Sequence, residues 1–193
     1  MREPHGARQR GRLGRAARRL AAVVVVACFI AAPGPAAALQ AAGAVVEPPA
    51  LLLPVQGKLA SELSDTFADT RDARQRGHEA IDILAPRGTP VLAVDDGRIV
   101  KLFLSKPGGI TLYHFDPTGQ FAYYYAHLDR YADGVAEGQT VRRGAVIGYV
   151  GATGNASADA PHLHFAIFRL GPEKQWWKGE PINPFGYLGG RKP

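Results

Sequence analysis

The sequence predicts an all-β domain with a compact antiparallel sheet at its core, and two observations carry this prediction. From residue 80 onward, short apolar runs rich in β-branched and aromatic residues recur, most of them roughly 8 to 14 residues apart, separated by turns containing Gly, Pro or Asp. No segment of that region has a helical period of useful length. Strands at this spacing are typical of antiparallel all-β domains.

Each expected strand is an apolar run that ends at turn residues. In chain order, the expected strands are Ala80–Leu84, Pro90–Val94, Arg98–Leu104, Ile110–Phe115, Phe121–His127, Ala145–Val150 and His162–Phe168. Asp96-Gly97 and Thr118-Gly119 are dipeptides typical of tight hairpin turns. His114 falls within one of these runs, and we expect it on the strand surface.

Residues 1–38 have the parts of a secretory signal peptide. Seven arginines precede an apolar run from Leu20 to Ala32, and Ala36-Ala37-Ala38 offers a cleavage site. The run is too short to span a bilayer comfortably, so we expect an exported protein of the periplasm or cell envelope. An uncleaved N-terminal anchor, a lipoprotein lipidated at Cys28 and full secretion remain as alternatives.

Charge and cysteine content exclude several classes of protein. The net charge of +6 comes from the leader, because the rest of the chain has 16 basic and 16 acidic residues. Nucleic acid is therefore not a favoured partner. Cys28 is the only cysteine, and signal cleavage would remove it. The mature protein would then be neither a cysteine hydrolase nor a cysteine-based zinc knuckle, and any metal would be held by His, Asp or Glu.

Behind the leader, the composition divides the chain into three parts. Residues 39–56 are rich in Ala, Val and Pro without a period, which predicts a flexible tether. The folded domain is expected over residues 57–188, with residues 189–193 as a tail.

The most informative stretch is Pro161-His162-Leu163-His164-Phe165, taken together with His78 and Asp82. Strand alternation puts His162 and His164 on one face, and the same parity allows His78 and Asp82 to share a face. Two imidazoles and one carboxylate on rigid elements make a three-ligand zinc site with a fourth position open for water. The alternative for these residues is a polar strand face with loop polar groups nearby.

Further motifs share an order and spacing with a known family. They are His78-Glu79-Ala80-Ile81-Asp82-Ile83, Ala85-Pro86-Arg87-Gly88-Thr89-Pro90-Val91, Ala93-Val94-Asp95-Asp96-Gly97, Tyr125-Ala126-His127-Leu128, Gly138-Gln139-Thr140-Val141, Gly144-Ala145-Val146-Ile147-Gly148, Gly154-Asn155 and Pro161 to Phe165. Residues 57–188 resemble the lysostaphin/LytM-type zinc metallopeptidases, which cut peptide bonds in bacterial peptidoglycan. The resemblance implies the sheet of the duplicated hybrid motif, with long loops walling a zinc groove.

The resemblance also implies a role for each key residue. His78, Asp82 and His164 would hold one zinc ion per chain, and His127 and His162 would be the two catalytic histidines. Chemistry agrees, because amide hydrolysis needs a proton carrier and a donor near the developing oxyanion beside the metal-activated water. A His-Glu-x-x-His arrangement is absent from the sequence.

Two positions depart from the family pattern. Ala80 stands where Gly is frequent, which exchanges one small residue for another. Ala166 stands where members often have an acidic residue or Gln, so a partner for a ligand histidine would come from elsewhere. Neither departure touches an expected ligand.

Two aromatic or polar positions are candidates for substrate binding. Tyr125, in the run Tyr123-Tyr124-Tyr125, would line the groove or form cross-strand aromatic pairs. Asn155 would face the groove or simply make a turn.

The favoured function is an exported zinc endopeptidase, a monomer, whose partners are peptidoglycan peptide stems and which contacts a membrane only through an uncleaved or lipidated N-terminus. The expected bond is a D-alanyl–meso-diaminopimelate cross-link rather than a glycine bridge. The first alternative is a non-catalytic wall-binding or hydrolase-activating module on the same fold. A biotinyl- or lipoyl-type carrier is the second, but it needs a lysine on a hairpin turn, and Lys101 is expected within a strand.

Overall fold

The computed structural model describes residues 46–71 and 76–189 of the chain. The predicted leader, the first part of the predicted tether and residues 190–193 of the predicted tail lie outside them. In chain order the elements are η2 (Ala60–Glu62), β1 (Thr70–Arg71), β2 (Arg76–Gly77), β3 (Ile81–Leu84), β4 (Pro90–Leu92), β5 (Gly97–Ser105), β6 (Gly109–Phe115), β7 (Phe121–Tyr131), β8 (Thr140–Val141), β9 (Val146–Val150), β10 (His162–Leu170), β11 (Gly179–Ile182) and η4 (Pro184–Gly186). Across these two ranges, no helix is long and apolar enough to cross a membrane.

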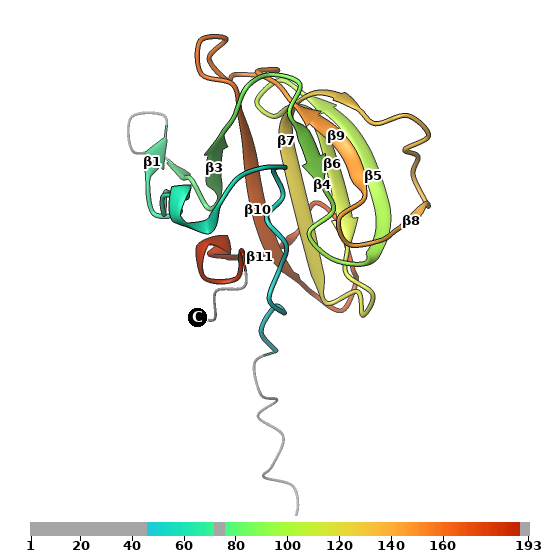
Figure 1. The fold of residues 1–193 in the computed structure, drawn as a ribbon. Coiled ribbons are helices and arrows are strands. Elements are labelled where there is room, and N and C mark those ends of the chain that lie inside the picture. The colour runs from blue at the N-terminus through green and yellow to red at the C-terminus, as the bar shows by residue number, and fades with distance from the viewer. Residues whose placement is uncertain (1–45, 72–75, 190–193) are drawn as a thin grey trace, which may run out of the picture. The chain divides into compact units, whose positions relative to one another are not determined.

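One nine-stranded antiparallel sheet makes up most of the domain (Figure 1). Its main path runs β11-β10-β7-β6-β5-β8, β3 pairs with β10, and β9 pairs with both β7 and β4. Strands β1 and β2 form a separate two-stranded sheet. The prediction of an antiparallel all-β domain is therefore confirmed, and each of the seven predicted strands overlaps an observed one.

The two predicted hairpin turns have different outcomes. Thr118-Gly119 joins β6 and β7, which pair with each other, so that prediction is confirmed. Asp96-Gly97 joins β4 and β5, but β4 pairs with β9 while β5 pairs with β6 and β8, so this prediction is wrong. A side chain at Gly97 would place its Cβ 2.0 Å from the carbonyl oxygen of Phe115. Glycine is needed here for a close approach between backbones, not for a hairpin.

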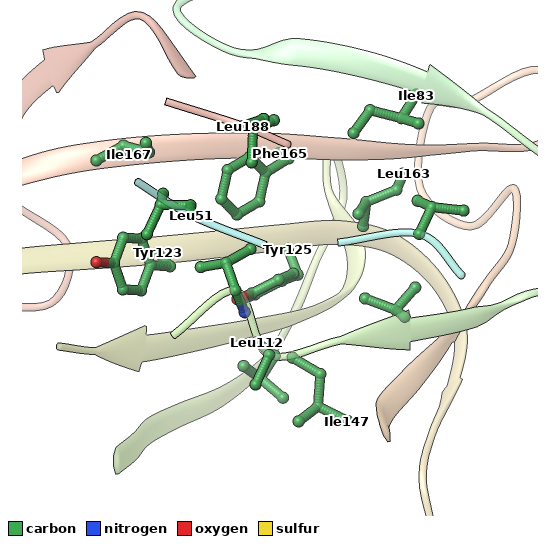
Figure 2. Close-up of a cluster of buried hydrophobic side chains, with 14 of the residues drawn as sticks. Leu51, Ile83, Leu112, Tyr123, Tyr125, Ile147, Leu163, Phe165, Ile167 and Leu188 are labelled. Atoms are coloured by element: carbon green, nitrogen blue, oxygen red, sulfur yellow. The ribbon is translucent and has the colours of Figure 1, made fainter. Parts of the chain in front are cut away.

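Strand β10 separates the hydrophobic core from the polar face of the sheet. Leu163, Phe165 and Ile167 alternate along it and are fully buried, whereas His162 and His164 point the other way. Figure 2 shows these apolar side chains gathered with those of β3, β6, β7 and β9, and its labelled members are Leu51, Ile83, Leu112, Tyr123, Tyr125, Ile147, Leu163, Phe165, Ile167 and Leu188.

The segment predicted as a tether contributes to this core. Leu51 forms a parallel bridge to Leu188, and Val55 an antiparallel bridge to Val91. Leu51 and Val55 are 0% and 1% exposed. The prediction of a flexible tether is thus wrong for residues 51–55, because their apolar side chains are needed to close one edge of the core.

The prediction for His114 is also wrong. Its side chain is fully buried, with its ring 5.3 Å from that of Tyr123 and 6.4 Å from that of Tyr125. The backbone at Gly97 covers the imidazole, since a Cβ there would lie 2.5 Å from Nε2. Burial lowers the pKa of His114 to about 4, so the ring is neutral near pH 7.

Candidate metal centre

Strand register brings two of the expected ligands face to face. In the β3–β10 pairing His164 stands opposite Asp82, and in the β7–β10 pairing it stands opposite Ala126. His127 follows Ala126 directly. The row across the three strands therefore holds the carboxylate of Asp82 and the imidazole of His164, and the imidazole of His127 comes from the residue next to the row. Figure 1 shows β10 beside both β3 and β7.

His78 reaches this row from the loop that precedes β3. Its backbone N–H donates to the carbonyl of Asp69 (2.8 Å), and the next N–H, of Glu79, donates to the carbonyl of Phe67 (3.0 Å). Glu79 has a φ of 53°, in the left-handed region. His78 and Asp82 therefore converge through a bend before the strand rather than through strand parity alone.

Three donor atoms from these residues converge on one point. His78 Nε2 lies 3.0 Å from Asp82 Oδ1 and 3.1 Å from His164 Nδ1, and His164 Nδ1 lies 3.1 Å from Asp82 Oδ1. Tetrahedral zinc with bonds of about 2.0–2.1 Å holds its ligand atoms about 3.3 Å apart. The three residues thus fit a zinc ion in both donor chemistry and spacing, and they form a group able to hold a metal.

Thr66 makes hydrogen bonds to two of the three ligand residues. His78 Nδ1 donates to the Thr66 carbonyl oxygen (2.7 Å), which places the proton on Nδ1 and leaves the Nε2 lone pair for the centre. The Thr66 hydroxyl accepts a hydrogen bond from the Asp82 backbone N–H (3.2 Å). The loop of residues 66–69 therefore supports the centre on one side.

His127 and His162 lie beside the three donors. The His127 ring centroid is 4.9 Å from that of His162 and 5.6 Å from that of His164, and His162 Nε2 is 3.8 Å from Asp82 Oδ1. The structure therefore brings together all five residues that were expected as metal ligands or catalytic histidines.

The two flanking imidazoles are held in the same way. His127 Nδ1 donates to the carbonyl of Thr153 (2.8 Å), and His162 Nδ1 donates to the carbonyl of Ala160 (2.9 Å). Each ring thus carries its proton on Nδ1, and Nε2 is the nitrogen that can accept one. Burial, with the neighbouring His162 and His164 rings, lowers the pKa of His127 to about 4, so this imidazole is neutral near pH 7.

The two expected substrate-binding residues do not join this group. Tyr125 is fully buried in the core, where its hydroxyl accepts a hydrogen bond from the Val94 backbone N–H (3.1 Å). It cannot touch a substrate, and that expectation is wrong because residue 125 has core parity on β7. Asn155 is exposed on the loop that carries Thr153, and its backbone N–H donates to the Pro107 carbonyl (3.0 Å).

Sequence reasoning missed the groups that orient the histidines. Thr66, Thr153 and Ala160 each offer a backbone carbonyl to an imidazole Nδ1. A carbonyl is present at every position of a chain, so these contacts leave no side-chain signature. The glycines of the Gly-Ala-Thr-Gly turn at residues 151–154 are a sequence signal that could have indicated a close backbone approach there.

Comparisons with known proteins cover this same region. The family model described as Peptidase family M23 matches residues 76–184. The L-Ala--D-Glu endopeptidase of Bacillus subtilis (strain 168) is 32% identical over 129 residues, which are 64% of this chain and 38% of that protein. The murein hydrolase activator NlpD of Escherichia coli (strain K12) is 32% identical over 120 residues, 62% of this chain and 28% of that one. The chain thus spans well under half the length of both relatives.

The fold of the chain is similar to that of a solved structure. The catalytic domain of the antimicrobial peptidase lysostaphin from Staphylococcus simulans superposes with a TM-score of 0.55 at 27% identity. The match covers 65% of this chain and 90% of that chain.

Proposed function

Because the chain belongs to peptidase family M23, we propose that it is an exported, zinc-dependent endopeptidase that hydrolyses peptide cross-links of bacterial peptidoglycan. The observation that carries the proposal is the convergence of His78 Nε2, Asp82 Oδ1 and His164 Nδ1 within 3.0–3.1 Å of one another, with two further imidazoles alongside. A cluster of polar side chains without a catalytic role would not require two additional imidazoles beside the three donor atoms.

The residues divide into ligands and proton carriers. His78, Asp82 and His164 would hold the zinc ion, which supplies Lewis acidity and a water whose pKa falls to about 7. His127 is neutral and offers Nε2 as a proton acceptor, and His162 is the second imidazole within reach of the centre. Hydrolysis adds the water oxygen to the carbonyl carbon and breaks the C–N bond. The proton taken from water returns to the leaving amine nitrogen through an imidazole.

The test measures metal and cleavage on the same preparation. The purified protein should contain one zinc ion per chain by elemental analysis and should release new peptide ends from isolated peptidoglycan, identified by mass. The fragments will also name the bond, for which we propose the D-alanyl–meso-diaminopimelate cross-link. His164→Ala should lose both metal and cleavage, whereas Asp133→Asn, at an exposed turn position, should keep both. Zinc-loaded protein that cleaves no peptidoglycan would contradict the proposal.

A hydrolase activator is the second candidate function, because the murein hydrolase activator NlpD is among the relatives. An activator needs neither a metal ion nor His127 and His162. All five residues are present and adjacent, which favours the enzyme. If the protein released no peptides alone but raised the rate of an added wall hydrolase, and if His164→Ala did the same, the activator would be the better description.

A further inference from the structure

His127 has a backbone conformation that is unusual for a strand residue. Its φ is 59°, in the left-handed region that L-residues other than Gly, Asn and Asp seldom adopt. Two hydrogen bonds hold it there: the backbone N–H donates to the Gly108 carbonyl (2.8 Å), and ring Nδ1 donates to the Thr153 carbonyl (2.8 Å). The loop containing Thr153 therefore acts directly on the orientation of this ring.

The Thr153 hydroxyl ties that same loop to two strands. It accepts a hydrogen bond from the backbone N–H of Ile110 on β6 (3.0 Å) and donates one to the carbonyl of Leu128 on β7 (2.7 Å). The pairing of β6 with β7 shifts register between Ile110 and Leu112, and that of β7 with β9 shifts between Leu128 and Arg130. The hydroxyl thus satisfies backbone groups where the ladders are irregular.

Two glycines bring the loop close enough for these bonds. A Cβ on Gly154 would lie 2.4 Å from both Gly109 N and the Pro107 carbonyl oxygen, and one on Gly109 would lie 2.2 Å from Thr153 Oγ1. Both glycines also have positive φ, at 76° and 65°. The β5–β6 turn and the 153–155 loop are therefore in direct backbone contact, and Thr153 has little freedom to shift.

We infer that Thr153 is the positioning residue for His127. Its hydroxyl fixes the 153–155 loop to strands β6 and β7, and its carbonyl then sets the tautomer and direction of the His127 imidazole. The effect of the His127 tautomer on the catalytic rate rests on the proposed function, but the effect of Thr153 on that tautomer does not. Among the described residues, the hydrogen bonds of Thr153 go to Ile110, His127 and Leu128, and not to the three donor atoms. Its replacement should therefore change His127 without removing the metal.

The experiment compares Thr153→Val, which keeps the shape and loses the hydroxyl, with Thr153→Ser, which keeps the hydroxyl. The first measurement is the ring ¹⁵N spectrum of the zinc-loaded protein, assigned by the loss of one signal set in His127→Gln. Wild type and Thr153→Ser should show His127 protonated on Nδ1. Thr153→Val should show a second tautomer with the proton on Nε2, while its zinc content stays at the wild-type value.

The second measurement is turnover of peptidoglycan. Thr153→Val should lower kcat by about tenfold to a hundredfold with a KM within about threefold of wild type, since a small displacement of a reacting group costs rates of this order. Thr153→Ser should restore kcat to within about threefold. If Thr153→Val does not fold, Thr153→Ala, which removes the hydroxyl without adding a branched carbon, takes its place.

Several results would overturn the inference. One is a wild-type His127 with its proton on Nε2, which needs no variant to observe. Another is a Thr153→Val protein with an unchanged His127 spectrum and unchanged kcat. A wild-type enzyme that cleaves nothing would refute the proposed function alone, because the tautomer comparison still decides the role of Thr153.

Discussion

His164 and Asp82 occupy directly opposed positions on β10 and β3, with Nδ1 of the histidine 3.1 Å from Oδ1 of the aspartate. A one-residue slip between these strands would turn one of the two side chains into the core. Leu163, Phe165 and Ile167 prevent that slip, because they are fully buried on the opposite face. The core therefore sets the geometry of the candidate metal centre.

Removal of the carboxylate should weaken metal binding strongly. Asp82→Asn leaves two imidazoles and a neutral amide. Loss of a group that only hydrogen-bonds a metal ligand typically lowers affinity by about 10- to 100-fold. Loss of the ligand itself should therefore lower zinc affinity by more than this. Competition titration against a chromophoric chelator measures the change. Asp133→Asn is the matched control, since Asp133 is exposed in a turn, and its affinity should equal that of wild type.

Replacement of His127 should separate chemistry from metal binding. His127→Gln should keep one zinc ion per chain and lower kcat by about 10²- to 10⁴-fold, the usual contribution of a proton-transfer group. Elemental analysis and peptide release on one preparation provide both values. Full activity in this variant would remove His127 from the mechanism.

Zinc should stabilise the folded protein. A ligand that binds only the folded state contributes about 2.7 kcal/mol at a hundredfold excess over its Kd, which corresponds to a Tm rise of roughly 5–10 °C for a domain of this size. Differential scanning calorimetry with zinc and with chelator measures the rise. Magnesium at the same concentration should give none, and neither should zinc added to His164→Ala.

Acid should weaken the fold through His114. The unfolded chain takes up a proton on this ring near pH 6.5, whereas burial lowers the pKa of His114 in the folded protein to about 4. The unfolded state therefore binds more protons between these values. The contribution of His114 to the free energy of unfolding should be complete well above pH 6.5. The free energy should then fall by up to about 3 kcal/mol as the pH drops to 4.

Urea unfolding of the chelator-treated protein at pH 7 and pH 4.5 tests this loss. His114→Gln should show a smaller decrease between the two pH values, because its residue 114 cannot be protonated. Identical decreases in wild type and variant would assign the acid sensitivity to other groups.

The segment around Leu51 should matter to stability although it precedes the predicted domain. Leu51→Ala should lower the free energy of unfolding by about 2–5 kcal/mol, the usual cost of emptying a buried leucine site. Leu59→Ala is the matched control, because Leu59 is 63% exposed, and it should cost less than about 0.5 kcal/mol. Chemical denaturation of both variants decides whether Leu51 belongs to the core.

Seven of the observed strands were predictable because their apolar runs end at Gly, Pro and Asp turns. Which face each strand buries was harder to predict, as His114 and Tyr125 illustrate. Alternation sorts residues into two faces, but only the folded chain shows that the backbone at Gly97 closes over His114. Strand β11 was missed because Gly179-Glu180-Pro181-Ile182 has little β-propensity and pairs only along part of β10.

The five residues of the candidate site were predictable for a different reason. His78, Asp82, His127, His162 and His164 carry chemistry in their side chains, and the motifs that contain them resemble those of a known family. The carbonyls of Thr66, Thr153 and Ala160 that hold the rings are backbone groups. Their role depends on close approach in three dimensions, which residue types do not encode.

The donors of the candidate metal centre are synthesised at different times. The bonds from His164 to His78 and Asp82 span 86 and 82 positions of the sequence. A chain synthesised from its N-terminus has only two of the three donors until β10 follows. The third donor therefore arrives with the last long strand of the sheet, and the complete set of donors exists only after most of the domain has been synthesised.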